Sequence, residues 1–343
     1  MTTFFLNRLA TEPHALAFAG QSTPWPVALA DQTTDPSLDE ALRGHVAAAG
    51  RLLTPVAADL LATTGRPVDL FGFAPNPARL GAAADATASV EGVALTQLGA
   101  LLDLEHLGYS VAQAKPLAVL GHSQGVLAVH MTRAIEAAGS IEAAGKTLNE
   151  ILAVAALIGA AGTRRVRELG LNPKYGEASP MLSVKGATRE QVEALVARVN
   201  NARGPISIAV TNSDNHHVLS GYPEDLAAFA LEAEREHQHQ AKLREQKLHG
   251  GTVFNPTLEY LEVTLPFHSP LMADAVEQTV AWAGACGFDQ KRTRALVEEV
   301  LLNHVDWNAR VKALFDDADP SKLWIVDLGP GNTLGKLIGN VVQ

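Results

Sequence analysis

The sequence predicts an α/β fold in which short buried strands alternate with helices, interrupted by a smaller module of mixed α and β structure. Apolar runs of strand length occur at 15–19, 116–120 and 323–328, with helical apolar spacing between them. The middle of the chain instead follows the order β-α-β-β-α, which is typical of a ferredoxin-like module. With 343 residues, 47% of them hydrophobic, the chain is long enough for such a module beside a core domain.

In the first half of the chain, each predicted strand ends at a turn. The run Ala-Leu-Ala-Phe-Ala at 15–19 stops at Gly20, as a buried parallel strand that enters a loop does. The run Pro-Leu-Ala-Val-Leu at 116–120 enters Gly-His-Ser-Gln-Gly at 121–125, and the residues after it have helical spacing. Helices are also expected over 37–63 and 89–107.

The mixed module is predicted to occupy residues 177–252, and the core residues 1–176 and 253–343. Within the module we expect strands at 181–184, 206–210 and 218–220, and helices at 189–199 and 223–248. The core is then expected to resume with a strand at 258–265. It closes with a strand at 323–328, a turn at 329–331 and a terminal helix.

Composition and charge exclude several classes of protein. The single cysteine, Cys286, excludes a disulfide framework, and no histidine spacing suggests a metal site, so we expect no metal. The net charge of −10 argues against nucleic-acid binding. The N-terminus lacks the pattern of a signal peptide, and the longest apolar stretch, 151–162, is too short to cross a bilayer. These features favour a cytoplasmic protein without a membrane or nucleic-acid partner.

The strongest chemical signal is Gly-His-Ser-Gln-Gly at 121–125. A serine in a tight turn between strand and helix is lifted out of the sheet, and the flanking glycines leave room where side chains would clash. The N-terminus of the following helix directs N–H groups toward a developing oxyanion. Ser123 is therefore predicted to be a nucleophile rather than an ordinary turn serine.

A serine nucleophile needs a base, which is most often histidine. Of the twelve histidines, His268 lies in a strand-to-helix turn late in the core, where it could face Ser123. His122 is held by the serine turn itself. His216 and His217 lie in a turn of the module, and His237 and His239 lie on a charged helix. From the residues alone, His268 as the base and His268 as a hydrogen-bonded turn histidine remain equally open.

Several motifs in the same order along the chain resemble one family. They are AGQS at 19–22, GHSQG at 121–125, TNSDNHHVLSG at 211–221, PFHSPLM at 266–272, VDWNARV at 305–311 and DLGPGNTLGKLI at 327–338. Together they resemble the malonyl- and acetyl-CoA:acyl-carrier-protein acyltransferases, most closely the acetyltransferase domain of a bacterial type I fatty acid synthase. The resemblance implies an α/β-hydrolase-like core with an inserted ferredoxin-like subdomain.

The resemblance also implies a role for each matching residue. Ser123 would carry the acyl group and His268 would be its base. The backbone N–H groups of Gln21 and Gln124 would form the oxyanion hole, and Asp306, by its carbonyl or its carboxylate, would orient the histidine. The substrate pocket is expected to include His122, Phe267, Asn212, Ile158 and Gly159.

The expected activity is transfer of an acetyl or other uncharged short acyl group from CoA to the phosphopantetheine thiol of an acyl carrier protein, priming fatty acid synthesis. Malonyl-specific members carry an arginine in the helix after the serine turn, but 151–162 holds no basic residue. Arg164 and Arg165 follow directly and could supply the charge instead. No permanently bound cofactor is expected, and the expected partners are the carrier and other domains of a fatty acid synthase.

Three alternatives remain open from the sequence. The enzyme could transfer malonyl or palmitoyl groups. It could be a serine thioesterase of the α/β-hydrolase type, although the acidic residues between serine and histidine, such as Asp214 and Asp225, fall inside the module. The basic stretch Arg164, Arg165 and Arg167 could bind CoA phosphates or an acidic carrier, but we favour an ordinary solvated helix face.

Overall fold

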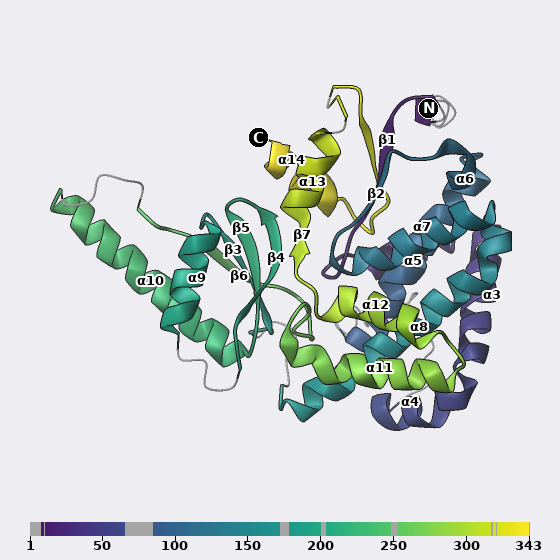
Figure 1. Ribbon diagram of the computed structural model, residues 1–343, viewed down its shortest axis with the longest axis horizontal. Coiled ribbons are helices and arrows are strands. Elements are labelled where there is room, and N and C mark those ends of the chain that lie inside the picture. Colours follow the sequence, from purple (N-terminus) through teal and green to yellow (C-terminus); the bar gives the residue numbers. More distant parts are fainter. Residues whose placement is uncertain are drawn as a thin grey trace.

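In the computed structural model, the chain forms two sheets, one parallel and one mixed, with most of the helices gathered around the parallel sheet (Figure 1). The structure describes residues 8–9, 11–65, 85–171, 178–199, 204–247, 253–316, 318–319 and 321–342. The first sheet has the strand order β2-β1-β8 and comprises β1 (His14–Phe18), β2 (Ala118–Gly121) and β8 (Trp324–Asp327). Both pairings are parallel, with Leu16 opposite Val119 on one side and Val326 on the other. The three core strands expected from apolar runs are confirmed.

Helices cover this sheet because their apolar faces need a partner. The segment after β1 forms α2 (Trp25–Gln32), α3 (Pro36–Leu52), the short η1 (Thr54–Val56) and α4 (Ala57–Thr64). The single helix expected over 37–63 is therefore broken, and the break lies at Pro55, which has no N–H for a helical bond. The Asp35 carboxylate caps α3 by accepting the N–H groups of Ser37 and Leu38.

Three long helices build the interior of the core: α5 (Ala86–His106), α7 (Val126–Ala138) and α8 (Ile141–Glu168). The short α6 (Val111–Ala114) leads into β2, and η3 (Ser123–Gly125) joins β2 to α7. Among the described residues, α8 is the one unbent helix long and apolar enough to cross a membrane, but 67% of its apolar window is buried inside the protein. It packs against α5, α7 and α11, as the central helix of a protein core does.

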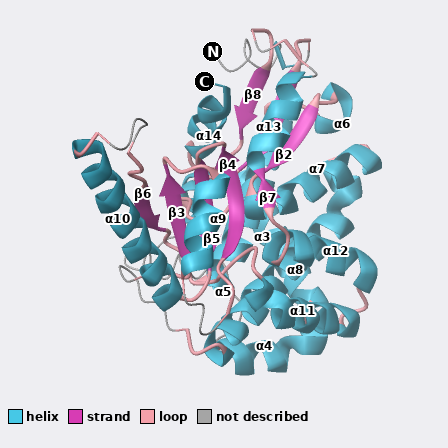
Figure 2. Cartoon of the chain, turned by 60° about the vertical axis from the view of Figure 1, so that its left-hand side comes forward, coloured by secondary structure: helices cyan, strands magenta, loops and turns pink. Residues whose placement is uncertain are grey.

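The second sheet has the strand order β6-β3-β5-β4-β7. It contains β3 (Met181–Lys185), β4 (Ser207–Ser213), β5 (His216–Ser220), β6 (Thr257–Tyr260) and the two-residue β7 (Val305–Asp306). Two helices, α9 (Arg189–Arg198) and α10 (Pro223–Glu245), accompany it (Figure 2). A separate apolar cluster, including Leu182, Val192, Leu219 and Phe229, fills the space between them. This confirms the ferredoxin-like arrangement inserted into the core.

The strand expected at 258–265 lies elsewhere than predicted. We expected it in the core after a boundary at 252/253, but β6 pairs antiparallel with β3, with Leu182 opposite Tyr260. The hairpin β4–β5 pairs with one edge of β3 through β5. The other edge of β3 still has backbone groups to satisfy, and β6 provides their hydrogen-bond partners. The other predicted boundary, at 176/177, lies outside the described residues, so the division into domains stays a prediction.

The C-terminal segment returns to the first sheet. It forms η4 (Pro270–Met272), α11 (Ala273–Ala285), α12 (Gln290–Leu301), α13 (Trp307–Asp316) and α14 (Thr333–Val342). Between α12 and α13, β7 pairs in parallel with β4, with Val210 opposite Val305. Both α13 and α14 also pack on β4. This part of the chain therefore joins the two sheets.

Candidate active site

Ser123 stands at the sharp turn between β2 and α7. Its backbone is in the left-handed region, with φ of 53°, which side chains larger than glycine seldom adopt. The turn is crowded from behind, because a Cβ at Gly125 would overlap the Phe18 carbonyl of β1. Glycine at this position lets the turn lie directly on the neighbouring strand. The structure therefore builds the strand-turn-helix that the motif predicted, with the Ser123 hydroxyl held out of the sheet.

The Ser123 hydroxyl meets His268, which is 145 residues away in the sequence. The Ser123 Oγ lies 2.7 Å from His268 Nε2, and His268 Nδ1 lies 2.8 Å from the Asn303 carbonyl oxygen. Because a carbonyl only accepts, Nδ1 carries the proton and Nε2 is free to accept the serine proton. His268 also has a left-handed backbone, with φ of 56°. Two strained residues that face one another are typical of a catalytic site.

Burial keeps His268 uncharged. Only 2% of the residue is exposed, and loss of water lowers the pKa of its imidazole to about 3. His122, His304 and Arg310 lower this pKa further, while the hydrogen bond to Asn303 opposes the shift. A neutral imidazole is the form that can remove a proton from serine.

The group that orients His268 differs from the one we predicted. The Asp306 carboxylate accepts the Ala309 N–H at the start of α13, and the imidazole is held by the carbonyl of Asn303 instead. Asn303 lies three residues earlier, because the chain enters β7 only at Val305 and the preceding turn faces the imidazole. A main-chain carbonyl leaves no mark in the sequence, and Asn303 lies two residues before the motif VDWNARV at 305–311, so the motif could not identify it.

The predicted oxyanion donors lie beside the serine. A Cβ on Gly20 would come within 2.9 Å of the Ser123 Cβ and 3.3 Å of the Gln124 nitrogen, so the loop at Gln21 lies against the turn. Among the described residues, the Gln21 N–H has no backbone acceptor, and the Gln124 N–H lies in the first turn after the nucleophile, in η3. Donors at these two places suit a developing oxyanion.

The side chains of the predicted pocket fall into two groups. His122 Nε2 lies 2.8 Å from Asn212 Oδ1, and its ring packs edge-on to Trp307 with centroids 5.2 Å apart. Burial lowers the pKa of His122. This pair links the serine turn to β4 of the second sheet.

The other predicted pocket residues are enclosed by the protein. Phe267 and Ile158 are buried, and a Cβ on Gly159 would lie 2.5 Å from the Ala86 carbonyl at the start of α5. Their place in a substrate pocket stays a prediction. A cavity of about 560 Å³ does reach Ser123, but it is lined by other residues: Val119, Leu120, Gly121, Val126, Val129, His130, Arg133, Glu299, Asn303, His304, Val305 and Arg310.

Arg310 is a residue of this cavity that sequence reasoning missed. It lies in the motif VDWNARV, and its guanidinium donates to the Gly121 carbonyl over 2.9 Å. The bond joins α13 to the free edge of β2, two residues before Ser123. Arg310 therefore braces the turn that carries the nucleophile.

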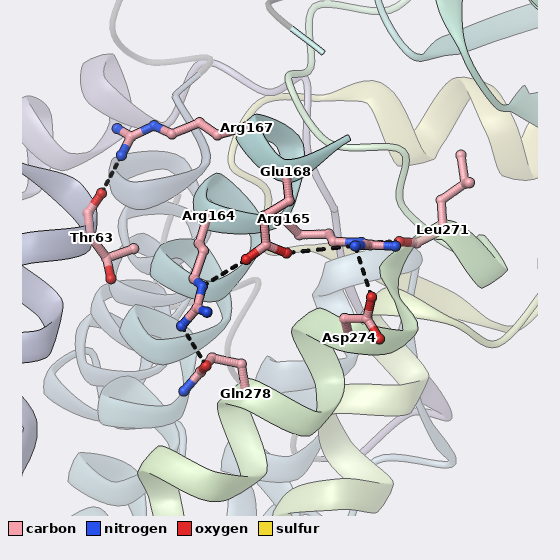
Figure 3. A network of polar contacts seen from close by, with 8 residues as sticks. All are labelled: Thr63, Arg164, Arg165, Arg167, Glu168, Leu271, Asp274 and Gln278. Atoms are coloured by element: carbon pink, nitrogen blue, oxygen red, sulfur yellow. Dashed lines mark hydrogen bonds and ion pairs between the residues drawn. The ribbon is translucent and has the colours of Figure 1, made fainter. Parts of the chain in front are cut away.

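The basic stretch at the end of α8 binds the protein itself (Figure 3). Arg164 donates to Glu168 and Gln278, and Arg165 donates to the Leu271 carbonyl and pairs with Asp274 at 2.8 Å. Arg167 donates to the Thr63 carbonyl over 2.5 Å. These guanidiniums connect α8 with α11 and α4, which agrees with a structural role.

The acidic residues that a thioesterase triad would need are engaged elsewhere. Asp214 accepts hydrogen bonds from Lys312 at 2.8 Å and from Asn308 at 2.6 Å. Asp225 lies on α10, one of the two helices that pack beside the second sheet. Within the described residues, no cluster of three histidine, cysteine or carboxylate side chains could hold a metal ion. The site is thus a serine and a histidine oriented by a main-chain carbonyl.

Comparison with known proteins gives matches in sequence and in fold. Residues 180–260 match the family model described as the fatty acid synthase central AT domain. The chain is 29% identical over 163 residues to the fatty acid synthase beta subunit TOXC of Cochliobolus carbonum, which covers 43% of this chain and 8% of that protein. It is 32% identical over 170 residues to fatty acid synthase 2 of Mycosarcoma maydis, covering 46% and 4%. The chain thus spans a small part of these relatives.

The fold is shared with a malonyl-transacylase solved in complex with its type II polyketide synthase acyl-carrier protein. The TM-score is 0.63 at 15% identity, with 96% of this chain and 93% of that one covered. The shared fold confirms an α/β-hydrolase-like core with a ferredoxin-like subdomain. The resemblance that the motifs indicated is confirmed as well: this chain is similar to the acyltransferases of the fatty acid synthase type.

Proposed function

We propose that this chain is an acyltransferase that moves an acetyl or other uncharged short acyl group from CoA, through Ser123, to the phosphopantetheine thiol of an acyl carrier protein. The observation that carries the proposal is the hydrogen bond of 2.7 Å between Ser123 Oγ and the neutral imidazole of His268. Serine becomes a nucleophile at neutral pH when such a base takes its proton.

The reaction follows from the positions of these groups. His268 Nε2 takes the proton of Ser123 as the oxygen attacks the thioester carbonyl, and the N–H groups of Gln21 and Gln124 stabilise the oxyanion. The CoA thiolate leaves with the proton from His268. The carrier thiol then gives its proton to His268 and attacks the acyl-serine, which restores the enzyme. No permanently bound cofactor takes part.

The preference for an uncharged acyl group is supported by the interior of α8. Its segment 151–162 is buried and has no cation. The arginines that follow this segment in the sequence, Arg164 and Arg165, are already bound to Glu168, Gln278 and Asp274. A malonyl carboxylate held against this segment, away from Arg133 and Arg310 of the cavity at Ser123, would lose about 1–3 kcal/mol, because its hydrogen bonds to water would not be replaced.

The proposed partners follow from the relatives. Two of them are named fatty acid synthase proteins, and the matched solved structure contains an acyl-carrier protein. We therefore propose that the chain acts together with a carrier and other domains of a fatty acid synthase, and that it primes synthesis. We also propose that the chain divides into a core that carries Ser123 and His268 and a module that contributes Asn212.

Mass spectrometry of the intact chain tests the proposal. After separate incubation with acetyl-, malonyl- and palmitoyl-CoA, we expect an acetyl adduct on Ser123, little malonyl adduct, and transfer to a holo carrier protein. Malonyl labelling above acetyl labelling would favour a malonyl transacylase, the activity named for the solved neighbour. Steady release of free acid without a carrier would identify a thioesterase. Absence of any adduct would refute acyl transfer through serine.

A further inference from the structure

The side chain of Gln124 is completely buried beside the nucleophile and forms two hydrogen bonds. Its Oε1 accepts from Nε2 of Gln21, and its own Nε2 donates to the Val90 carbonyl of α5 over 2.5 Å. A buried amide with both ends bonded holds one orientation, because rotation would leave polar groups unpaired. Gln124 therefore connects three separate segments: the serine turn, the loop after β1, and α5.

A second buried glutamine, Gln97 of α5, holds the same loop from its other end. Gln97 is completely buried, and its Nε2 donates to the Ala19 carbonyl over 2.6 Å and approaches the Gly329 carbonyl at 3.3 Å. The Ala19 N–H also donates to Gly329 over 3.0 Å. The residues before Gly20 are thus anchored on α5 and on the turn after β8.

Beyond Gly20 the loop has fewer anchors. Thr23 Oγ1 donates to the Gly20 carbonyl over 2.9 Å, which is a contact within the loop itself. Ser22 has a left-handed backbone, with φ of 61°. Among the described residues, the bond from the Gln21 side chain to Gln124 is the one hydrogen bond that ties Gln21 to another segment.

We propose that Gln124 is a positioning residue: its side chain holds Gln21 so that the backbone N–H of Gln21 meets the oxyanion formed at Ser123. The inference rests on the proposed function. It assigns two tasks to one residue, since the Gln124 N–H is a predicted oxyanion donor and the Gln124 side chain places the other donor. An oxyanion hole needs its donors at about 2.7–3.1 Å from the oxyanion, so a small displacement of the loop weakens transition-state binding.

Leucine variants separate this role from general stability. Gln124→Leu and Gln21→Leu each remove the bond between the two side chains and keep a similar volume. Gln32→Leu is the matched control, because Gln32 of α2 donates through Nε2 to the Thr96 carbonyl of α5 over 2.9 Å. Among the described residues, its side chain forms no hydrogen bond with the loop or the serine turn. All three variants lose an amide-to-amide or amide-to-carbonyl bond.

Rapid-quench mass spectrometry of acyl-enzyme formation from acetyl-CoA measures the result. We expect Gln124→Leu to lower the maximal acylation rate by about 10- to 100-fold, below the loss for deleting a donor outright, with the half-saturating acetyl-CoA concentration changed less than about twofold. Gln32→Leu should keep the wild-type rate. The double variant Gln21→Leu/Gln124→Leu should be no slower than Gln124→Leu, because the bond that Gln21→Leu removes is already lost in Gln124→Leu.

Wild-type acylation rates in Gln124→Leu, or losses in the two single variants that multiply in the double variant, would overturn the positioning role. If Gln124→Leu does not fold, Gln21→Leu measures the same contact from the half-exposed side. If the wild-type chain forms no acyl-enzyme, the proposed function is refuted, and the positioning role of Gln124 is refuted with it. The wild-type reaction therefore distinguishes failure of the proposed function from failure of the positioning role alone.

Discussion

The low pKa of His268 predicts that acylation stays active far into the acid range. Burial lowers this pKa to about 3, so at pH 5 about 99% of the imidazole is neutral, whereas an ordinary histidine with a pKa of about 6.5 would be about 3% neutral. The general base is the neutral form. We therefore expect the single-turnover acylation rate at pH 5 to be within about twofold of that at pH 8, against a fall of about 30-fold for an unshifted histidine.

The assay should avoid groups of the substrate that titrate in the same range. Acetyl-pantetheine carries no phosphate, so its charge is constant between pH 4 and 8, and rapid-quench mass spectrometry follows the acyl-serine directly. An inflection near pH 6.5 in the wild-type profile would refute the reasoning. It would mean that His268 is solvated in the free enzyme or that another histidine is the base.

The same shift makes a statement about stability. Above pH 6.5 the imidazole is neutral in both the folded and the unfolded chain. As the pH falls below 6.5 the unfolded chain binds a proton that folded His268 refuses until about pH 3, so stability present at pH 8 is lost on acidification. For this one residue the loss between pH 8 and pH 5 is about 2 kcal/mol. Urea unfolding of wild type and His268→Gln at both pH values measures it, and equal losses in the two proteins would contradict the assigned pKa.

Three further outcomes follow from the site. Ser123→Ala should fold normally, as judged by circular dichroism, and lose acyl-enzyme formation by at least about 10,000-fold; an acyl adduct on this variant would place the nucleophile elsewhere. Gly20→Ala should slow acylation by about 10- to 100-fold, because the added Cβ would lie 2.8 Å from the His122 carbonyl oxygen. Its control is Gly44→Ala, whose added Cβ would have no neighbour within 4 Å. This control should keep the wild-type acylation rate and raise the free energy of unfolding by up to about 1 kcal/mol. Arg164→Gln/Arg165→Gln should leave the ratio of acetyl to malonyl labelling unchanged, since both guanidiniums bind the protein's own side chains, and a changed ratio would show that they face the substrate.

Local patterns were sufficient where neighbouring residues decide the structure. The turn at Gly121–Gly125 follows from a buried strand, two glycines and a helix, and the structure has all of them in place. The apolar runs at 15–19 and 323–328 likewise became β1 and β8. The helix expected over 37–63 was interrupted at Pro55, whose effect on helices is also local.

Contacts between distant segments were decided by the tertiary structure. The sequence singled out Ser123 and His268 but could not bring them within 2.7 Å, nor select the Asn303 carbonyl over Asp306, because a main-chain acceptor is common to every residue. It could not assign β6 to the second sheet, since a strand pattern does not specify its neighbour. By itself the sequence determined where most strands and helices form and which side chains carry reactive groups. Packing determined which of those groups meet and which lose water, and hence the low pKa of His268.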